Sequence, residues 1–122
     1  MPIEKVNLQE KFELFKDHWN PRIVGELNGQ AVKIAKIKGE FVWHHHENED
    51  ELFLVIDGTL LMDFRDQTIT LKKGEMIIVP RGVEHRPRTN GEEVQILLFE
   101  PLSTLNTGED RNEFTKENLE HI

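Results

Sequence analysis

The sequence contains no cysteine among its 122 residues, so disulfide bonds and thiol chemistry are excluded. Basic residues are also few, because 15 lysines and arginines stand against 23 acidic residues and the formal net charge is −8. Nucleic acid and anionic membranes both require a basic protein surface, so we expect neither as a partner. No hydrophobic run approaches the length of a membrane span, and the first residues lack the apolar stretch of a secretory signal. We therefore expect a cytoplasmic location.

The middle of the chain consists of short apolar segments separated by turn signals. The Asn28-Gly29 pair is a strong hairpin signal between segments 22–27 and 30–38. Further strands are expected at 41–46, 51–57, 60–65, 68–72, 76–79, 85–89 and 94–99. Regular short strands without a long helix between them indicate an all-β sandwich or barrel, and this chain length suits one domain.

A helical pattern precedes the strands. Asn7 can cap a helix, and Glu10 follows at the spacing of a capping box. An apolar stripe at helical spacing then runs through Leu8, Phe12, Phe15 and Trp19. Because the Asn20-Pro21 pair disfavours further helix, we expect the helix to end there.

These signals divide the chain into three parts. Residues 1–21 form an N-terminal helical segment, and residues 22–101 form the β-domain. Residues 102–122 are polar and are expected to pack on or near the barrel as a tail, with a short helix from Thr115 onward.

Three consecutive histidines, His44 to His46, precede an acidic turn and Glu51. If residues 41–46 and 51–57 are strands joined by that turn, His44 and His46 share one face and His45 points away. A four-residue turn also makes His46 and Glu51 opposite partners, so two imidazoles and one carboxylate converge.

His85 is the best candidate for a fourth ligand, because it begins a strand after an apolar strand and a proline- and glycine-containing turn. The predicted metal ligands are therefore His44, His46, Glu51 and His85. Three imidazoles and one carboxylate suit Mn, Fe, Ni, Cu or Zn better than Mg or Ca, which prefer oxygen ligands only. A structural or coincidental histidine cluster is the competing interpretation.

At these residues the sequence resembles the cupin superfamily. The first cupin motif is matched by Gly39, His44, His46, Glu51 and Gly58, and the second by Gly74, Pro80, Gly82 and His85. Two departures occur: four residues instead of the usual five separate Gly39 from His44, and Thr89 stands where the second motif often ends in asparagine. The resemblance covers Gly39 to about Pro101.

The resemblance implies a cupin double-stranded β-helix, a jelly-roll-like barrel that holds one divalent transition metal inside. It also implies similarity to small single-domain bacterial cupins described as phosphomannose-isomerase-like. Cupins with this ligand set include isomerases, epimerases and dioxygenases. We therefore expect a small metalloenzyme, of isomerase or dioxygenase type, acting on a small sugar- or carboxylate-like molecule.

The alternative is a non-catalytic module that binds a small ligand through the metal, and a metal-stabilised barrel without activity is a third hypothesis. The fold alone does not decide between them, because one fold hosts many activities. An inward polar residue able to act as a base near the metal favours an enzyme, whereas a wholly apolar surrounding favours binding.

Other polar residues give weaker signals. Arg86 and Arg88 resemble anion clamps, but strand alternation directs both away from the site if His85 points inward, so we expect them at the surface. Glu100 and Asp57 could lie near the barrel mouth and act as bases. Apolar side chains of the ligand face are expected near the cavity as core, namely Phe53, Val55, Met62 and Phe64, whereas His18 and His121 are expected at the surface.

The strands expected at 51–57 and 94–99 are apolar on both faces. A strand with one face in water would alternate cleanly between apolar and polar residues. The second sheet, the helical stripe or a second subunit could cover the outer face. We expect a homodimer, with a monomer covered by its own helix as the alternative.

Overall fold

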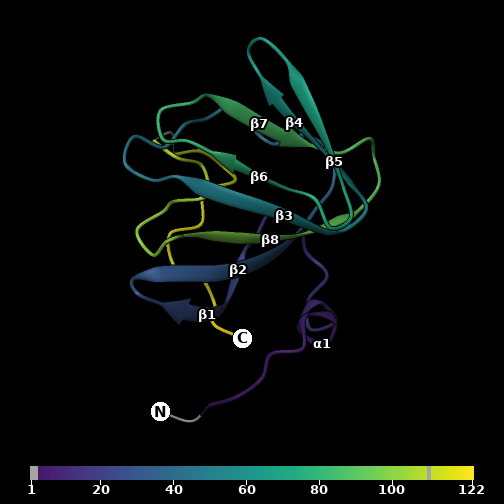
Figure 1. The fold of residues 1–122 in the computed structure, drawn as a ribbon, viewed down its shortest axis with the longest axis vertical. Helices are drawn as coiled ribbons and strands as arrows, with labels where there is room; N and C mark the ends of the chain where they lie inside the picture. The colour runs from purple at the N-terminus through teal and green to yellow at the C-terminus, as the bar shows by residue number, and fades with distance from the viewer. Residues whose placement is uncertain (1–2, 110) are drawn as a thin grey trace.

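The computed structural model describes residues 3–109 and 111–122, and within them the chain folds into two antiparallel sheets and one short helix (Figure 1). The elements are α1 (Leu8–Phe12), β1 (Arg22–Leu27), β2 (Gln30–Ile37), β3 (Glu51–Asp57), β4 (Thr59–Phe64), β5 (Thr68–Lys72), β6 (Met76–Val79), β7 (His85–Arg88) and β8 (Val94–Pro101). One sheet has the strand order β1-β2-β8-β3-β6 and the other β5-β4-β7. The predicted all-β double-sheet fold is confirmed. Within the described ranges, no helix has the length and apolar character needed to cross a membrane.

The core lies between the two sheets. Val55 of β3, Leu60 and Met62 of β4 and Val94 of β8 are completely buried there. Phe53 is buried with them, and Phe64 packs partly buried against the same cluster. Burial of each such apolar side chain contributes about 1.5–3 kcal/mol, which makes this cluster the main source of stability. The inward direction predicted for the ligand face of β3 is therefore observed.

The hairpin predicted at Asn28-Gly29 forms, and β4 and β5 form a second hairpin. Asn28 and Gly29 adopt positive φ angles of 50° and 75°, the conformation of the two-residue turn whose twist matches that of the β1 and β2 strands. In the β4–β5 hairpin the Phe64 N–H donates to the Gln67 carbonyl at 2.7 Å. The residues of these two turns therefore set the register of the β1–β2 and β4–β5 strand pairs.

The N-terminal helix is much shorter than predicted. Asn7 does cap α1, since its side chain accepts a hydrogen bond from the Glu10 N–H at 3.0 Å. Beyond the helix, the backbone bonds to β2 instead, because the Lys36 side chain donates to the Phe15 carbonyl and the Trp19 N–H donates to the Lys36 carbonyl. The apolar stripe is therefore a packing pattern that continues after the helix ends.

The outer face of the five-stranded sheet is covered over part of its width. Phe12 and Phe15 bury against Ile34 of β2 and contact Ile56 and Leu97. Toward β6 the covering ends, and Leu52 and Leu54 are only half-buried beside their register partners Ile78 and Met76. Ile78 and Met76 are 55% and 54% exposed, so an apolar strip remains open on this face.

The C-terminal tail, expected over residues 102–122, lies against the barrel without a helix after Thr115 in the described part. Its last residues pair with β1, because the Ile23 N–H donates to the Glu120 carbonyl at 2.9 Å. Nearer the site, the Glu109 N–H donates to the His45 carbonyl at 3.1 Å. Gly108 has a φ of 65°, and a Cβ there would clash with the same carbonyl oxygen, so this close approach requires glycine. Residues 1, 2 and 110, within the predicted segments, lie outside the described residues.

The outer face of the smaller sheet carries a buried carboxylate that the sequence analysis did not single out. Asp63 is 4% exposed and accepts hydrogen bonds from the Arg88 Nε at 2.7 Å, the Arg86 Nη2 at 2.9 Å and the Thr68 hydroxyl at 2.7 Å. Arg86 and Arg88 thus point away from the metal-ligand side, as alternation predicts. Burial alone would raise the pKa of Asp63, but these donors lower it to about 2.

Asp63→Asn should lower the free energy of unfolding by ~1–3 kcal/mol at neutral pH, because the amide cannot satisfy two guanidinium groups. Since the pKa of Asp63 is depressed, its stabilisation is complete above its ordinary pKa and is lost as the pH falls toward about 2. Urea unfolding of both proteins across this pH range measures the difference. Equal stability at pH 7 would contradict the role given to Asp63.

Candidate metal centre

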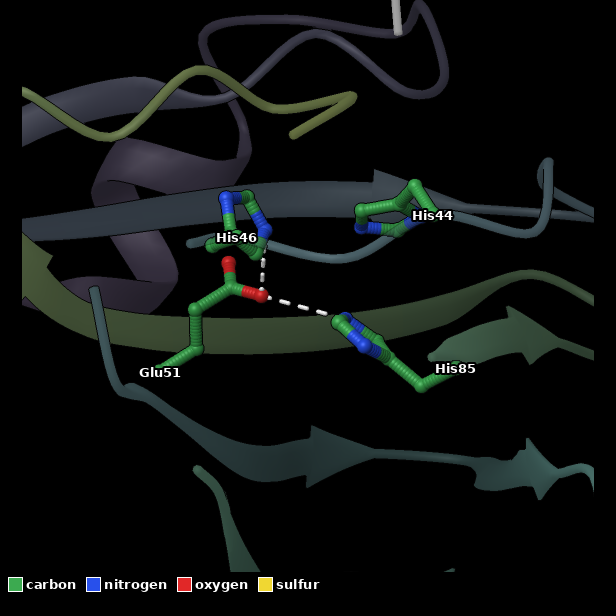
Figure 2. Close-up of side chains that lie close together, drawn as sticks. All are labelled: His44, His46, Glu51 and His85. Carbon is green, nitrogen blue, oxygen red and sulfur yellow. Dashed lines mark hydrogen bonds and ion pairs between the residues drawn. The ribbon is translucent and has the colours of Figure 1, made fainter. Parts of the chain in front are cut away.

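The predicted ligands His44, His46, Glu51 and His85 come together in the structure. Each offers one ligand atom, and the ligand atoms all lie within 4.8 Å of one another. None of these side chains is more than 4% exposed. Figure 2 shows the three rings and the carboxylate pointing toward one shared space.

The backbone that places the histidines differs from the prediction. Residues 41–46 do not form a strand paired with β3, because β3 lies between β6 and β8 and both of its edges are occupied. Instead the segment crosses to the smaller sheet, where His44 and His85 form an isolated bridge with two backbone hydrogen bonds of 2.9 and 3.1 Å. The predicted hairpin was therefore wrong, although the predicted ligands converge.

Both sheets contribute to the site. Glu51 is the first residue of β3 in the larger sheet, and His85 is the first residue of β7 in the smaller one. The Gly82 N–H donates to the His46 carbonyl at 2.7 Å and ties the turn before His85 to the histidine segment. His45 points away, with its side chain about one third exposed at 33%.

The orientation of two rings is fixed by backbone carbonyls. The Nδ1 atoms of His44 and His85 lie 2.9 Å from the carbonyl oxygens of Val42 and Val83. Because a carbonyl oxygen only accepts, these Nδ1 atoms carry the protons, and a neutral ring presents its unprotonated Nε2 to the site. This second hydrogen bond is the usual way of orienting a metal-binding histidine.

The arrangement of donor atoms fits a cation. The Nε2 atoms of His46 and His85 lie 2.8 and 3.1 Å from Glu51 Oε1. Both ring nitrogens of His46 are nevertheless buried without a properly directed hydrogen bond among the described residues. An unprotonated nitrogen and a carboxylate oxygen repel at these distances unless a proton or a cation lies between them. The four residues could therefore hold a divalent transition-metal ion, as three imidazoles and a carboxylate typically do.

The pKa shifts favour the protonation states that metal binding needs. Burial, followed by the charge of His85, lowers the pKa of His44 to about 4, so its imidazole is neutral at pH 7. Burial alone would raise the pKa of Glu51, but the Glu100 carboxyl together with His46 and His85 holds it well below its usual range. Glu51 is therefore an anion in a buried site.

Glu100 of β8 is the one base candidate that the structure brings to the site. It is 2% exposed, and burial followed by the negative charge of Glu51 raises its pKa well above the usual range. The two carboxyls therefore share one proton between them in the metal-free protein. The other base candidate, Asp57, is exposed at the end of β3 and does not join the cluster.

Sequence reasoning missed Lys33. Its side chain is 2% exposed, and Nζ donates to Glu100 Oε1 at 2.9 Å. Its positive charge balances the one negative charge left on the Glu51 and Glu100 pair. Strand alternation could have indicated it, because Lys33 lies on the same face of β2 as the buried Ala31, Ala35 and Ile37.

An apolar cavity adjoins the ligand cluster. Its lining residues are Trp19, Pro21, Ala35, Ile37, Phe41, His44, Glu51, Phe53, Pro87, Ile96, Leu98, Glu100 and Asn106. The volume open to the centre of a water-sized molecule is about 40 Å³, enough for a few waters or a small ligand. Phe53 therefore borders the cavity as predicted, whereas Val55, Met62 and Phe64 are core residues only.

Comparison with known proteins identifies the family. A model described as a cupin domain matches residues 32–100, which contain all four candidate ligands. The chain belongs to the cupin family. A cupin-2 domain containing protein from Shewanella frigidimarina has 50% sequence identity to this cupin, with a TM-score of 0.77, and the match covers 79% of this chain and 93% of that chain.

Two curated relatives show how much of each protein the similarity covers. The uncharacterized protein YdbB of Bacillus subtilis is 43% identical over 67 residues, which cover 54% of this cupin and 59% of YdbB. An acireductone dioxygenase of Phaeosphaeria nodorum is 36% identical over 96 residues, which cover 69% of this cupin and 54% of the relative. This cupin thus spans less than two thirds of the length of either relative.

The three histidines of the central run should differ in their effect on metal uptake. His44→Ala and His46→Ala remove buried ligand atoms and should weaken metal affinity by more than the roughly 10–100-fold that loss of a supporting contact costs. His45→Ala is the matched control and should leave uptake unchanged, since that side chain points away from the ligand cluster. Elemental analysis and titration of untagged protein measure the difference, and equal loss in all three variants would contradict the assigned directions.

Proposed function

We propose that this cupin is a metal-dependent enzyme of the dioxygenase type that acts on a small molecule. The observation that carries the proposal is a buried set of four ligands beside a cavity that also contains an inward carboxyl, Glu100. An inward acid–base group next to a metal site favours an enzyme over a purely binding module. The metal is one of Mn, Fe, Ni, Cu or Zn, held by His44, His46, Glu51 and His85.

Each part of the site has a role in this proposal. A bound ion would supply Lewis-acid polarisation of substrate oxygen atoms. The four ligand residues would hold it beside the cavity, which His44 and Glu51 also line. The apolar walls around Phe53 and Leu98 exclude water and so strengthen the electrostatic interactions inside. Glu100 lies where it could accept or return a substrate proton.

The dioxygenase type has more support than the isomerase type. The acireductone dioxygenase of Phaeosphaeria nodorum is a relative of this chain, and its name describes a dioxygenase that acts on an acireductone. A phosphomannose-isomerase-like function requires a group that binds phosphate, and the described lining of the cavity contains no lysine or arginine. Lys33 lies behind Glu100 and is already paired with it.

A non-catalytic ligand-binding module is the second candidate function. The small volume and mostly apolar lining of the cavity favour it, because tight binding of a small molecule needs little more than such a lining and a metal. Turnover with a reactive substrate separates the two functions.

The proposed enzyme should consume O₂ when it has metal and an enediol substrate together. The experiment loads metal-free, untagged protein with one equivalent of Fe(II) and follows dissolved O₂ after addition of an acireductone. Glu51→Ala should abolish consumption by preventing metal retention, whereas Asp63→Asn, on the outer face of the other sheet, should retain it. Binding of the acireductone without O₂ consumption would favour the binding module, and failure to retain any of the five metals would overturn both.

We also propose that the chain forms a homodimer through the open part of the outer face. Met76 and Ile78 are more than half exposed there, next to the half-buried Leu52 and Leu54. Exposed apolar surface that continues a covered apolar face is typical of an association site. A two-fold dimer would place the same strip of each copy against the other.

Ile78→Glu should convert the dimer to a monomer, because it places a charge in the middle of the proposed interface. Light scattering coupled to gel filtration measures the mass of the wild type and the variant. Leu27→Glu is the matched control, since Leu27 is also exposed but lies on β1, at the opposite edge of the five-stranded sheet from β6. A monomeric wild type would contradict the homodimer.

A further inference from the structure

The cavity beside the ligand cluster has two chemically different parts. Its charged lining residues form one connected group, since His44 and Glu51 belong to the ligand cluster and the Glu100 carboxyl is hydrogen-bonded to that of Glu51. The rest of the lining is apolar apart from Trp19 and Asn106. A ligand that reaches the metal ligands from this cavity therefore also lies against an apolar wall.

The two polar side chains of that wall have their polar atoms engaged by the protein. Trp19 Nε1 donates to the Lys38 carbonyl at 3.0 Å. Asn106 Nδ2 donates to the Phe114 carbonyl, and Asn106 Oδ1 accepts from the Lys116 N–H, both at 2.8 Å. A hydroxyl or charged group placed against this wall would lose hydrogen bonds to water without regaining as many, which disfavours a sugar.

Ala35 has the smallest side chain of the lining. It is 2% exposed and lies on the inward row of β2 between Lys33 and Ile37. Its register partner on β8 is Ile96, which also lines the cavity. Because the Ala35 side chain is a single methyl group, space that a larger residue would fill stays open beside the two strands.

The open space is small enough to select a ligand by size. The volume open to the centre of a water-sized molecule is about 40 Å³, whereas one water needs about 10–15 Å³. The space therefore holds about three groups of that size, such as an unbranched chain of about three carbon atoms. On another side it is closed by Trp19 and Phe41, which stack with 4.7 Å between their ring centroids.

We propose that Ala35 is a specificity-determining residue of this site. The ligand class is a small metal chelator that carries a short unbranched apolar group, about three carbon atoms long. The chelating oxygens lie at the metal ligands, and the apolar group lies against Ala35 and Ile96. This inference rests on the proposed metal function and adds a contact that no metal ligand makes.

A series of unbranched alkyl hydroxamates tests the size limit, because all members chelate a metal through the same two oxygens and differ only in the length of the chain. Calorimetry with Zn(II)-loaded wild type gives the affinity of each probe. Affinity should rise about fourfold for each added methylene from acetohydroxamate to butyrohydroxamate, as expected for burial of apolar surface. Pentano- and hexanohydroxamate should gain nothing further, since their additional carbon atoms do not fit.

Two substitutions at position 35 should shift the limit in opposite directions. Ala35→Val fills the open space, so butyrohydroxamate should lose its advantage of about fifteenfold over acetohydroxamate. Ala35→Gly enlarges the space, so pentanohydroxamate should bind about fourfold more tightly than butyrohydroxamate. Both variants should retain metal and a cooperative thermal transition.

Ala31→Val is the matched control. Ala31 lies on the same inward row of β2 and is completely buried, but it does not line the cavity. The same substitution there should keep the wild-type dependence on chain length, which separates the filling of the cavity from a general effect of added volume.

The outcomes separate this inference from the proposed function. A metal-loaded wild type that binds all probes equally, binds none of them, or binds ever more tightly up to hexanohydroxamate overturns the inference and leaves metal binding intact. Folded Ala35→Val and Ala35→Gly proteins that keep the wild-type dependence overturn the role of Ala35. A wild type that takes up no metal overturns the proposed function and this inference together.

Discussion

The burial of the Glu51 carboxylate is the constraint on which the rest of the site depends. An anion that is 4% exposed must be compensated by nearby groups, because the loss of hydration is large. The compensation comes from two directions: imidazoles on one side, and the Glu100 and Lys33 pair on the other. A metal ion between the imidazoles and Glu51 would complete the compensation of the Glu51 charge on the imidazole side.

The sheet order explains why these groups meet. Leu52 of β3 pairs with Phe99 of β8, so Glu51 and Glu100 are the next residues along the two strands. β2 lies on the other side of β8 and supplies Lys33 at the diagonal. Two carboxyls opposite each other are normally destabilising, and a buried ion pair seldom adds net stability. Their presence in a cavity wall is therefore better explained by a role toward a ligand than by a role in folding.

The strands and the ligand set could be predicted from the sequence because both depend on short-range patterns. Turn residues fixed the hairpins, and the cupin motif spacing indicated His44, His46, Glu51 and His85. The path of the chain between His44 and Glu51 could not be predicted, since several strands could have paired with β3. Lys33 and Asp63 were missed for the same reason. A charged residue in a strand is visible in the sequence, but the neighbouring strand that supplies its partner is not.

The helix and the tail show how tertiary contacts override local signals. The apolar stripe predicted a helix as far as Trp19, yet after Phe12 the backbone forms hydrogen bonds with the side chain and the carbonyl of Lys36 on β2 instead. Trp19 is thereby placed against Phe41, and Phe114 of the tail lies 5.2 Å from the same ring. Segments from both ends of the chain thus enclose the cavity that the β-strands leave open. A site enclosed in this way has a low local dielectric constant, so a polar or charged contact inside it is stronger than the same contact would be in water.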